Sequence, residues 1–193
     1  MKSTKAALMD ARLEKLFDRM EANRTALLSS LEMLSDNQLA YKPGGDPWSI
    51  NEVIQHLVLS EQGTHRYLMK KNQAASLPRA SLAATLRSIG LTLFMRLPVK
   101  FKMPARANAA PGGDIPLSQL KREWEETRQN LRQFITELPS ERQRVLIFRH
   151  PFMGYFNIYQ TLRFIEEHIR HHLKQIRRIR EWKDFPVGAS EKR

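Results

Sequence analysis

Residues 157–182 read NIYQTLRFIEEHIRHHLKQIRRIREW, and this stretch predicts a long helix. Asn157 followed three residues later by Gln160 is a signature of a helix start, because both side chains can accept hydrogen bonds from nearby backbone amides. The helical pattern continues to about Trp182. His168 and His172 lie four residues apart in it, so both imidazoles fall on one face of the helix, about 6 Å apart along its axis.

Three earlier segments also have helical patterns. Residues 3–34 carry apolar side chains at helical spacing, with no glycine or proline to interrupt them. Ser49 and Glu52 form a predicted capping box at the start of a helix over residues 49–74. Residues 117–138 form a third helical segment, which a proline ends. Four long helices without a clear alternating strand pattern predict an all-α four-helix bundle.

The connections between these helices differ in length. Turn-rich residues 35–47 join the first two helices, and a short linker that contains His150 precedes the last one. Residues 75–116 form a long irregular connection rich in proline and glycine, in which residues 82–97 have the pattern of a further helix. Residues 62–113 contain nine lysines or arginines and no acidic residue. Connections of this kind often shape the mouth of a site between helices.

Composition limits the classes of protein to consider. The 193 residues suit one domain, predicted as residues 1–185 with a flexible tail at 186–193. The absence of cysteine excludes disulfides, Cys-type zinc sites, iron–sulfur clusters and a thiol nucleophile. A formal net charge of +12 suggests anionic partners: nucleic acid, acidic lipid or small anions. No stretch is long enough to span a bilayer and no signal peptide is evident, which predicts a cytoplasmic protein.

Any bound metal must therefore be held by histidine or carboxylate side chains. His168 and His172 have the spacing that two ligands of one ion need on a single helix, and Gln175 lies on the same face. His171 points about 60° away from that face. The same spacing also arises by coincidence on solvated basic helices, so the pair alone leaves both interpretations open.

A third ligand must come from another helix, and His56 is the best candidate. It lies two turns into the second helix, one turn after Glu52. The alternative for His56, on a largely apolar helix, is a hydrogen-bonded core histidine. His65 lies on the opposite side of that helix, because nine residues turn it by about 180°. We expect His65 to face solvent or a neighbouring helix.

Two stretches carry a family resemblance. Residues 39–57, LAYKPGGDPWSINEVIQHL, resemble the second-helix signature of the DinB-like metalloprotein superfamily, which includes the YfiT-type metal-dependent hydrolases. In that signature a turn, a Trp-Ser-Ile start and a ligand histidine eight residues after the tryptophan recur. Residues 150–160, HPFMGYFNIYQ, and 164–176, FIEEHIRHHLKQI, are similar to the family's last helix with its H-x-x-x-H ligand pair. The order of helices matches over residues 5–182.

The resemblance implies an up-down-down-up bundle with a divalent metal ion bound by His56, His168 and His172. Zinc or nickel suits imidazole ligands best. Relatives in this superfamily include transferases and isomerases that use low-molecular-weight thiols such as bacillithiol or mycothiol. The resemblance therefore implies that the ion activates either a thiol or a water molecule. The thiol would be transferred to a small substrate, or the water would hydrolyse it, and that substrate would be anionic or electrophilic. The basic connection departs from the family pattern, so the substrate itself does not carry over.

Further residues near the predicted ligands have more than one interpretation each. Glu52 either caps its helix, orients a ligand imidazole, or acts as a base. Gln175 either holds a water or a ligand histidine, or lies in solvent. His150 precedes a proline in an irregular linker, where a side chain reaches a site mouth or serves the structure alone. We expect Trp48 to pack at the start of the second helix.

Two alternatives involve no catalysis. The last helix, with the basic connection, is a candidate phosphate-binding surface for nucleic acid. The second alternative is a homodimeric interaction module that uses an apolar patch in the connection. The basic residues of the helix are Arg170, Lys174, Arg177, Arg178, Arg180 and Lys183, against Glu181, and the patch is Leu91, Leu93, Phe94 and Leu97.

Overall fold

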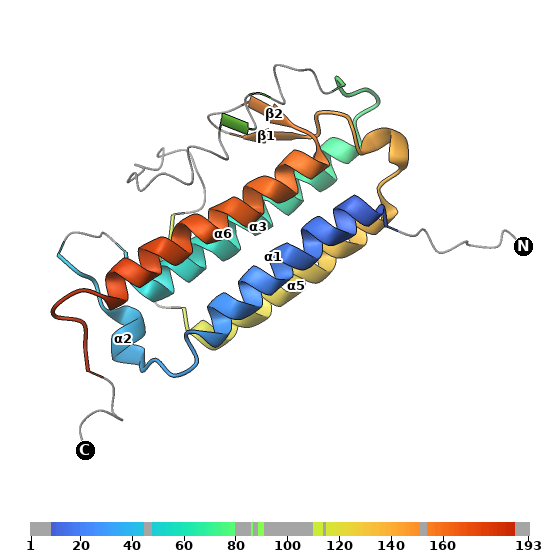
Figure 1. The fold of residues 1–193 in the computed structure, drawn as a ribbon. Coiled ribbons are helices and arrows are strands. Elements are labelled where there is room, and N and C mark those ends of the chain that lie inside the picture. The colour runs from blue at the N-terminus through green and yellow to red at the C-terminus, as the bar shows by residue number, and fades with distance from the viewer. Residues whose placement is uncertain are drawn as a thin grey trace, which may run out of the picture.

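Four long helices lie side by side in this structure, a computed structural model (Figure 1). It describes residues 9–44, 48–79, 86, 89–90, 110–113, 115–150 and 154–187. The chain runs in one direction along α1 and α6 and in the opposite direction along α3 and α5, which confirms the predicted up-down-down-up bundle. The helices are α1 (Ala11–Ser29), α3 (Ile50–Asn72), α5 (Leu117–Glu137) and α6 (Ile158–Arg180).

Side-chain caps fix where the helices begin. Ser49 accepts from the backbone amide of Glu52 at the start of α3, and Asn157 accepts from that of Gln160 at the start of α6. In both capping boxes, the side chain of Glu52 or Gln160 in turn accepts a hydrogen bond from the backbone amide of the cap residue, as the sequence predicted. The first helix begins later than expected. Asp10 caps α1 through the amides of residues 12 and 13, so the helix starts at Ala11.

Two small elements lie in segments that the sequence indicated as turns or linker. The turn-rich stretch contains α2 (Asp36–Ala40), which Ser35 caps in a box with Gln38. The linker before α6 contains the strands β1 (Phe148–His150) and β2 (Gly154–Phe156), which pair antiparallel. Strands of three residues are too short to show an alternating pattern, which explains why the sequence did not indicate them.

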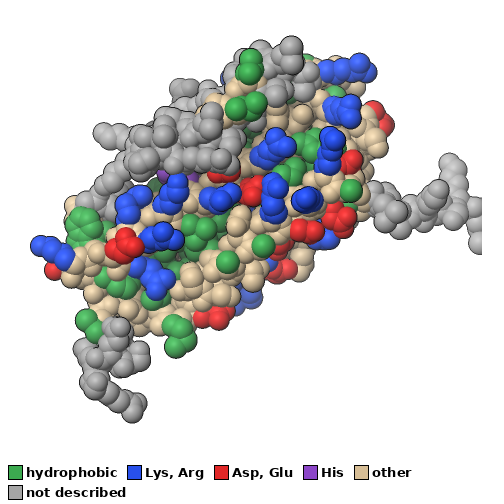
Figure 2. All heavy atoms as spheres, in the orientation of Figure 1, with side chains coloured by type: hydrophobic (Ala, Val, Ile, Leu, Met, Phe, Trp, Pro, Cys, Tyr) green, Lys and Arg blue, Asp and Glu red, His purple; other side chains and the backbone are tan. Residues whose placement is uncertain are grey.

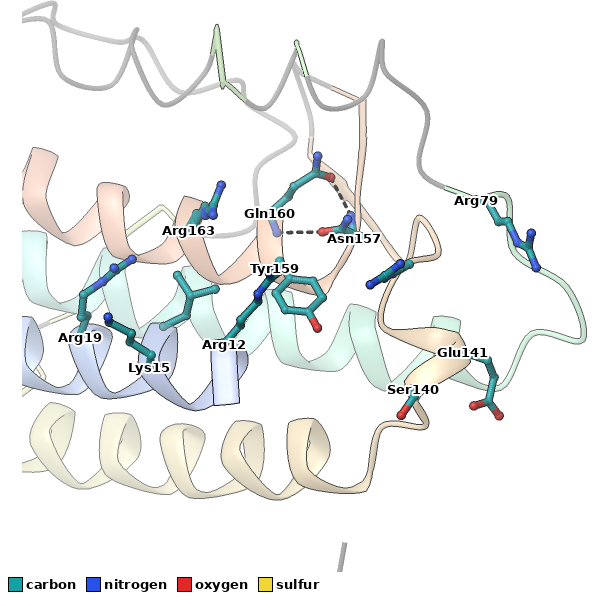
Figure 3. Close-up of a pocket in the computed structure, with 12 residues that line it drawn as sticks. Arg12, Lys15, Arg19, Arg79, Ser140, Glu141, Asn157, Tyr159, Gln160 and Arg163 are labelled. Atoms are coloured by element: carbon teal, nitrogen blue, oxygen red, sulfur yellow. Dashed lines mark hydrogen bonds between the residues drawn. The ribbon is translucent and has the colours of Figure 1, made fainter. Parts of the chain in front are cut away.

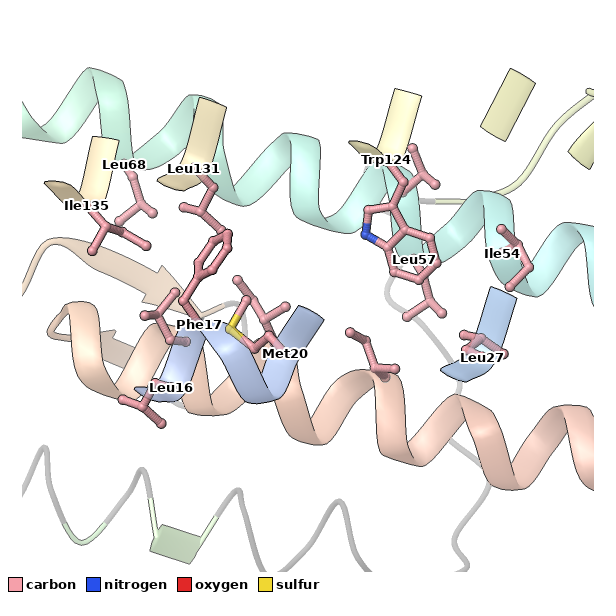
Figure 4. Close-up of a cluster of buried hydrophobic side chains, with 14 of the residues drawn as sticks. Leu16, Phe17, Met20, Leu27, Ile54, Leu57, Leu68, Trp124, Leu131 and Ile135 are labelled. Carbon is pink, nitrogen blue, oxygen red and sulfur yellow. The ribbon is translucent and has the colours of Figure 1, made fainter. Parts of the chain in front are cut away.

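The core lies between the apolar faces of the four helices (Figure 4). α1 packs against α6, α3 packs against α5, and α3 also contacts α6. Burying a leucine, isoleucine or phenylalanine side chain stabilises the fold by roughly 1.5–3 kcal/mol each. The labelled core residues, all 5% exposed or less, are Leu16, Phe17, Met20, Leu27, Ile54, Leu57, Leu68, Trp124, Leu131 and Ile135.

A buried ionic cluster crosses this core. The guanidinium of Arg128 on α5 donates to both carboxylate oxygens of Glu61 on α3, at 2.6 and 2.8 Å. It also donates to Glu21 on α1 at 2.8 Å. The side chains of Arg128 and Glu61 are 1% and 2% exposed, so the pair is cut off from water. This cluster links three of the four helices at one level.

Most of the connection between α3 and α5 lies outside the described residues. That includes almost all of the predicted helix over residues 82–97, and the apolar patch at residues 91–97. The described ends of the connection are held by side chains of the bundle: Gln55 exchanges two hydrogen bonds with the backbone of Gly112, and Asn51 donates to the carbonyl of Ile115. None of the helices in the described ranges is both long enough and apolar enough to cross a membrane.

We expect Arg128→Met to lower the free energy of unfolding by about 3–5 kcal/mol, because Glu61 would be left as a buried charge without a partner. The double variant Arg128→Met/Glu61→Leu should recover most of that loss, since no lone charge remains. Urea denaturation measures the free energy of unfolding of the wild type and of both variants.

The matched control is Lys121→Met. Lys121 makes a 3.5 Å contact with the exposed Glu32, so its loss should change the free energy of unfolding by less than about 1 kcal/mol. Equal losses in Arg128→Met and Lys121→Met would contradict a special role for the buried pair.

Candidate metal centre

Three histidines meet where α3 and α6 lie side by side. The Nε2 atom of His168 lies 3.1 Å from that of His56 and 3.1 Å from that of His172. One nitrogen from each ring can be chosen so that all three lie within 4.8 Å of one another. Each residue is 9% exposed or less. The structure therefore brings together the three residues that the family resemblance indicated as ligands.

The spacing of these nitrogens suits one shared ion. Imidazole nitrogens bind zinc at about 2.0–2.1 Å, and two ligands in a tetrahedral arrangement then lie roughly 3.3 Å apart. The two 3.1 Å distances between Nε2 atoms are close to that value. The donor set of three nitrogens without a carboxylate suits zinc or nickel better than calcium or magnesium.

Burial keeps two of these imidazoles, those of His168 and His172, in the form that binds metal. Desolvation is the main reason why the pKa of His168 lies well below its ordinary value, and His172 and His56 lower it further. Burial and then His56 likewise hold the pKa of His172 well below the ordinary value. Both rings are consequently neutral at pH 7, with a lone pair available for an ion.

Gln175 orients one of the three rings. Its Oε1 atom lies 2.7 Å from Nδ1 of His172, and an amide oxygen can only accept, so Nδ1 of the ring carries the proton and donates it. The Nε2 atom of His172 is then unprotonated and faces the other two histidines. Gln175 is 8% exposed, so of its two interpretations the structure shows contact with a histidine and not exposure to solvent.

Aromatic rings surround the cluster. The half-buried Trp48 lies against His56 and His172, with ring centroids 4.9 and 6.2 Å away. Phe164 stacks on His168 at 5.4 Å, with 16° between the planes. The sequence pattern gave no role to Phe164, although its position four residues before His168 places it on the same helical face. These rings limit the access of water to the three histidines from their sides.

His150 lies next to this aromatic layer. It is 7% exposed, stacks on Phe156 at 5.7 Å and meets the edge of Phe164 at 4.7 Å. Burial lowers the pKa of His150 to about 4, so its ring is neutral at pH 7. Phe164 contacts both His150 and His168, which places His150 one ring away from the three-histidine cluster.

The other two histidines lie outside the group of three. His171 is half-buried and perpendicular to His172, with ring centroids 5.2 Å apart. His65 is also half-buried and meets the edge of Phe134 on α5 at 6.3 Å, so it faces a neighbouring helix. Burial is the main reason why the pKa of His65 lies below its ordinary value.

Glu52 is engaged at the start of α3. One carboxylate oxygen accepts from the backbone amide of Ser49 at 2.8 Å, and the other accepts from Nζ of Lys42 at 2.7 Å. Partial burial raises the pKa of the Glu52 carboxyl, but the bonds and charge from Lys42 and Ser49 outweigh burial and lower it. Glu52 is thus an anion that caps the helix carrying His56.

Comparison with known proteins places this arrangement in context. The family model of the DinB superfamily matches residues 19–176, a range that includes the three histidines and Gln175. The chain is 30% identical over 155 residues to the uncharacterized protein YuaE of Bacillus subtilis (strain 168), a match covering 79% of this chain and 90% of YuaE. The crystal structure of TT2238, a four-helix bundle protein, superposes with a TM-score of 0.55 at 20% identity, covering 86% of this chain and 98% of TT2238. That likeness shows the fold.

The buried His150 predicts a pH dependence of stability in protein kept free of metal by a chelator. Its pKa is about 4 in the folded protein and about 6.5 when unfolded, so the unfolded chain binds more protons between these values. The stabilisation that neutral His150 gives is complete above pH 6.5 and is lost as the pH falls towards 4. The fall in the free energy of unfolding between pH 7 and pH 5 should be about 2 kcal/mol smaller in His150→Phe than in the wild type.

Urea denaturation at the two pH values checks this. His65→Phe is the control, because removing the half-buried His65 should change the fall in the free energy of unfolding between pH 7 and pH 5 by less. A wild-type pH dependence retained in full by His150→Phe would show that His150 titrates normally.

Proposed function

The chain belongs to the DinB superfamily, and from that premise we propose that it is a metal-dependent enzyme whose divalent ion is bound by His56, His168 and His172. The observation that carries this proposal is the meeting of three buried imidazole nitrogens from two helices, with 3.1 Å between successive Nε2 atoms. Open three-histidine sites are typical of catalytic metal centres, whereas structural zinc sites have four protein ligands.

When bound, an ion held by three neutral imidazoles keeps its full positive charge, leaves a position open, and lowers the pKa of a water or thiol there. The residues of the chain prepare for this in three ways. Burial keeps the ring of His168 neutral. Gln175 holds the proton of His172 on Nδ1, so that Nε2 faces the centre. Trp48 and Phe164 cover the rings and keep the surroundings apolar.

The reaction we propose is transfer of a low-molecular-weight thiol such as bacillithiol to a small electrophilic substrate, with hydrolysis of a small anionic substrate as the variant that uses water. Two considerations support it. The superfamily resemblance implies thiol-dependent chemistry, and the formal net charge of +12 favours a cofactor or substrate that carries carboxylates. Zinc or nickel is the ion that the imidazole ligands favour.

Elemental analysis of tag-free protein, purified without chelator, tests the metal. We expect about one equivalent of zinc or nickel in the wild type and its loss in His168→Ala, because one of three ligands is removed. His65→Ala is the control, since His65 lies against α5 and outside the cluster. Metal-loaded wild type should also consume bacillithiol in the presence of an electrophile, measured as loss of free thiol.

The outcomes separate the two parts of the proposal. An absence of metal in the wild type, even after incubation with excess zinc or nickel, would overturn the metal centre. A wild type that binds one equivalent of metal but neither consumes thiol nor hydrolyses a small anionic ester is the other contrary outcome. That result would overturn the proposed reaction and leave the metal centre standing.

The contact between Gln175 and His172 generates a further prediction. Gln175→Leu should weaken metal binding by about 10- to 100-fold, because His172 loses the acceptor that fixes its orientation. Gln175→Glu should retain wild-type affinity or exceed it, since a carboxylate is a stronger acceptor. Competition with a chromophoric chelator measures both affinities.

The matched control is Gln133→Leu, which removes the same amide group from the exposed face of α5. It should leave metal affinity unchanged. Wild-type affinity in Gln175→Leu would show that Gln175 has no part in orienting the ring.

A further inference from the structure

A concave site lies on another side of α6 from the three histidines, where α6 begins beside the first turns of α1 (Figure 3). This pocket has a volume of about 980 Å³, at the upper end of the range of small-molecule sites. Its walls come from α1, α6, the 3-10 turn Ser140–Arg142 and the described end of the α3–α5 connection. Six of its lining residues are cationic: Arg12, Lys15, Arg19, Arg79, Arg144 and Arg163.

The pocket is separate from the three histidines. Its lining on α6 ends at Arg163, and His168 follows five residues later, about 7.5 Å further along the axis and turned by about 140° around it. The opposite wall is α1, whereas the partner of α6 at the histidines is α3, which carries His56. A ligand in the pocket and an ion at the histidines would therefore occupy different faces of α6.

The positive charges in the pocket exceed the negative ones. Arg19 forms an ion pair with Glu166 at 3.0 Å. Among the described lining residues, one is acidic, and it is Glu141. Nearby Asp10 is engaged as the cap of α1. Within the described ranges, no ion pair is recorded for Arg12, Lys15, Arg79, Arg144 or Arg163. These five cations outnumber Glu141 and the nearby Asp10 by three positive charges, and a polyanion would reduce the repulsion among them.

The chemistry of the lining favours phosphate groups. Guanidinium groups bind phosphate with two parallel hydrogen bonds, and arginine is the most frequent cation here. The start of α6, which the neutral Asn157 caps, lies at the pocket, so the positive end of its helix dipole adds to the field of the side chains. At the start of α1 the Asp10 carboxylate offsets the helix dipole. Figure 2 shows Lys and Arg side chains in a band over α1 and α6 on this face, which would attract anions to it.

We propose that this pocket binds a small molecule bearing an oligophosphate chain, such as a nucleoside triphosphate or tripolyphosphate. A single phosphate carries too little charge to neutralise the cations. The buried side chain of Leu16 and the polar side chains of Asn157, Tyr159 and Gln160 complete a concave lining that suits a compact ligand. A duplex nucleic acid would instead need an extended ridge of phosphate contacts.

Isothermal titration calorimetry with ATP and with tripolyphosphate, at about 50 mM salt, tests the proposal. Arg144→Gln/Arg163→Gln should weaken both ligands at least about tenfold, because two charge-assisted contacts are lost. Arg12→Gln/Lys15→Gln changes the opposite wall and should give a similar loss. All four side chains are exposed, so thermal melts should show the wild-type fold in both variants.

The matched control is Arg122→Gln/Arg177→Gln, which removes two exposed cations outside the pocket and should change affinity less than about twofold. His172→Ala should leave binding unchanged, since the histidines are a separate site. Equal weakening by the pocket and control variants would show attraction to overall charge alone and would overturn the site. An absence of binding would also overturn the site, as would inorganic phosphate that binds as tightly as tripolyphosphate. So would a DNA oligonucleotide that outcompetes ATP and whose binding the pocket and control variants weaken equally.

Discussion

The guanidinium of Arg128 sets the relative heights of three helices. It bonds the buried Glu61 through two parallel hydrogen bonds and the partly exposed Glu21 through a third. Because a buried charge without a partner is strongly unfavourable, a slip of α5 by one turn, about 5.4 Å, is excluded. Glu61 lies five residues after His56 on α3, so the same bonds fix the height of His56 relative to α1 and α5. One of the three histidines is thus held at its height by an ionic contact outside the histidine cluster.

α6 serves two opposite chemical environments. One face carries His168 and His172, which are buried, neutral and covered by aromatic rings. The other carries exposed cations and adjoins a water-accessible basic pocket. The separation follows from the helical period, because residues four apart share a face whereas residues five apart diverge. A single helix can therefore present neutral histidines to one partner helix and a positive field to solvent.

Local signals predicted the long helices, and long-range contacts account for what the sequence did not show. Caps and apolar periodicity act within a few residues, which is why the starts of α3 and α6 were predicted correctly. The His168/His172 pair was also local. The sequence offered His56 as a candidate third ligand, and the family resemblance favoured that role over a core histidine, because no local pattern links residues that are 112 positions apart. No local pattern distinguishes Arg128 and Glu61 from surface charges, and charged residues are rarely buried. The basic pocket was not predicted because it combines four segments distant in sequence.

The ionic cluster and the histidine cluster share no residue, and this separates assembly of the bundle from uptake of an ion. Arg128 joins α1, α3 and α5, whereas the histidines join α3 to α6. If the proposed centre binds an ion, the chain could fold first and take up the ion afterwards, in a cluster that is already formed. The ion would then close a loop of more than a hundred residues and suppress transient separation of α3 from α6. In a cell, the supply of metal would control how often this seam opens, and so how long the protein resists proteolysis.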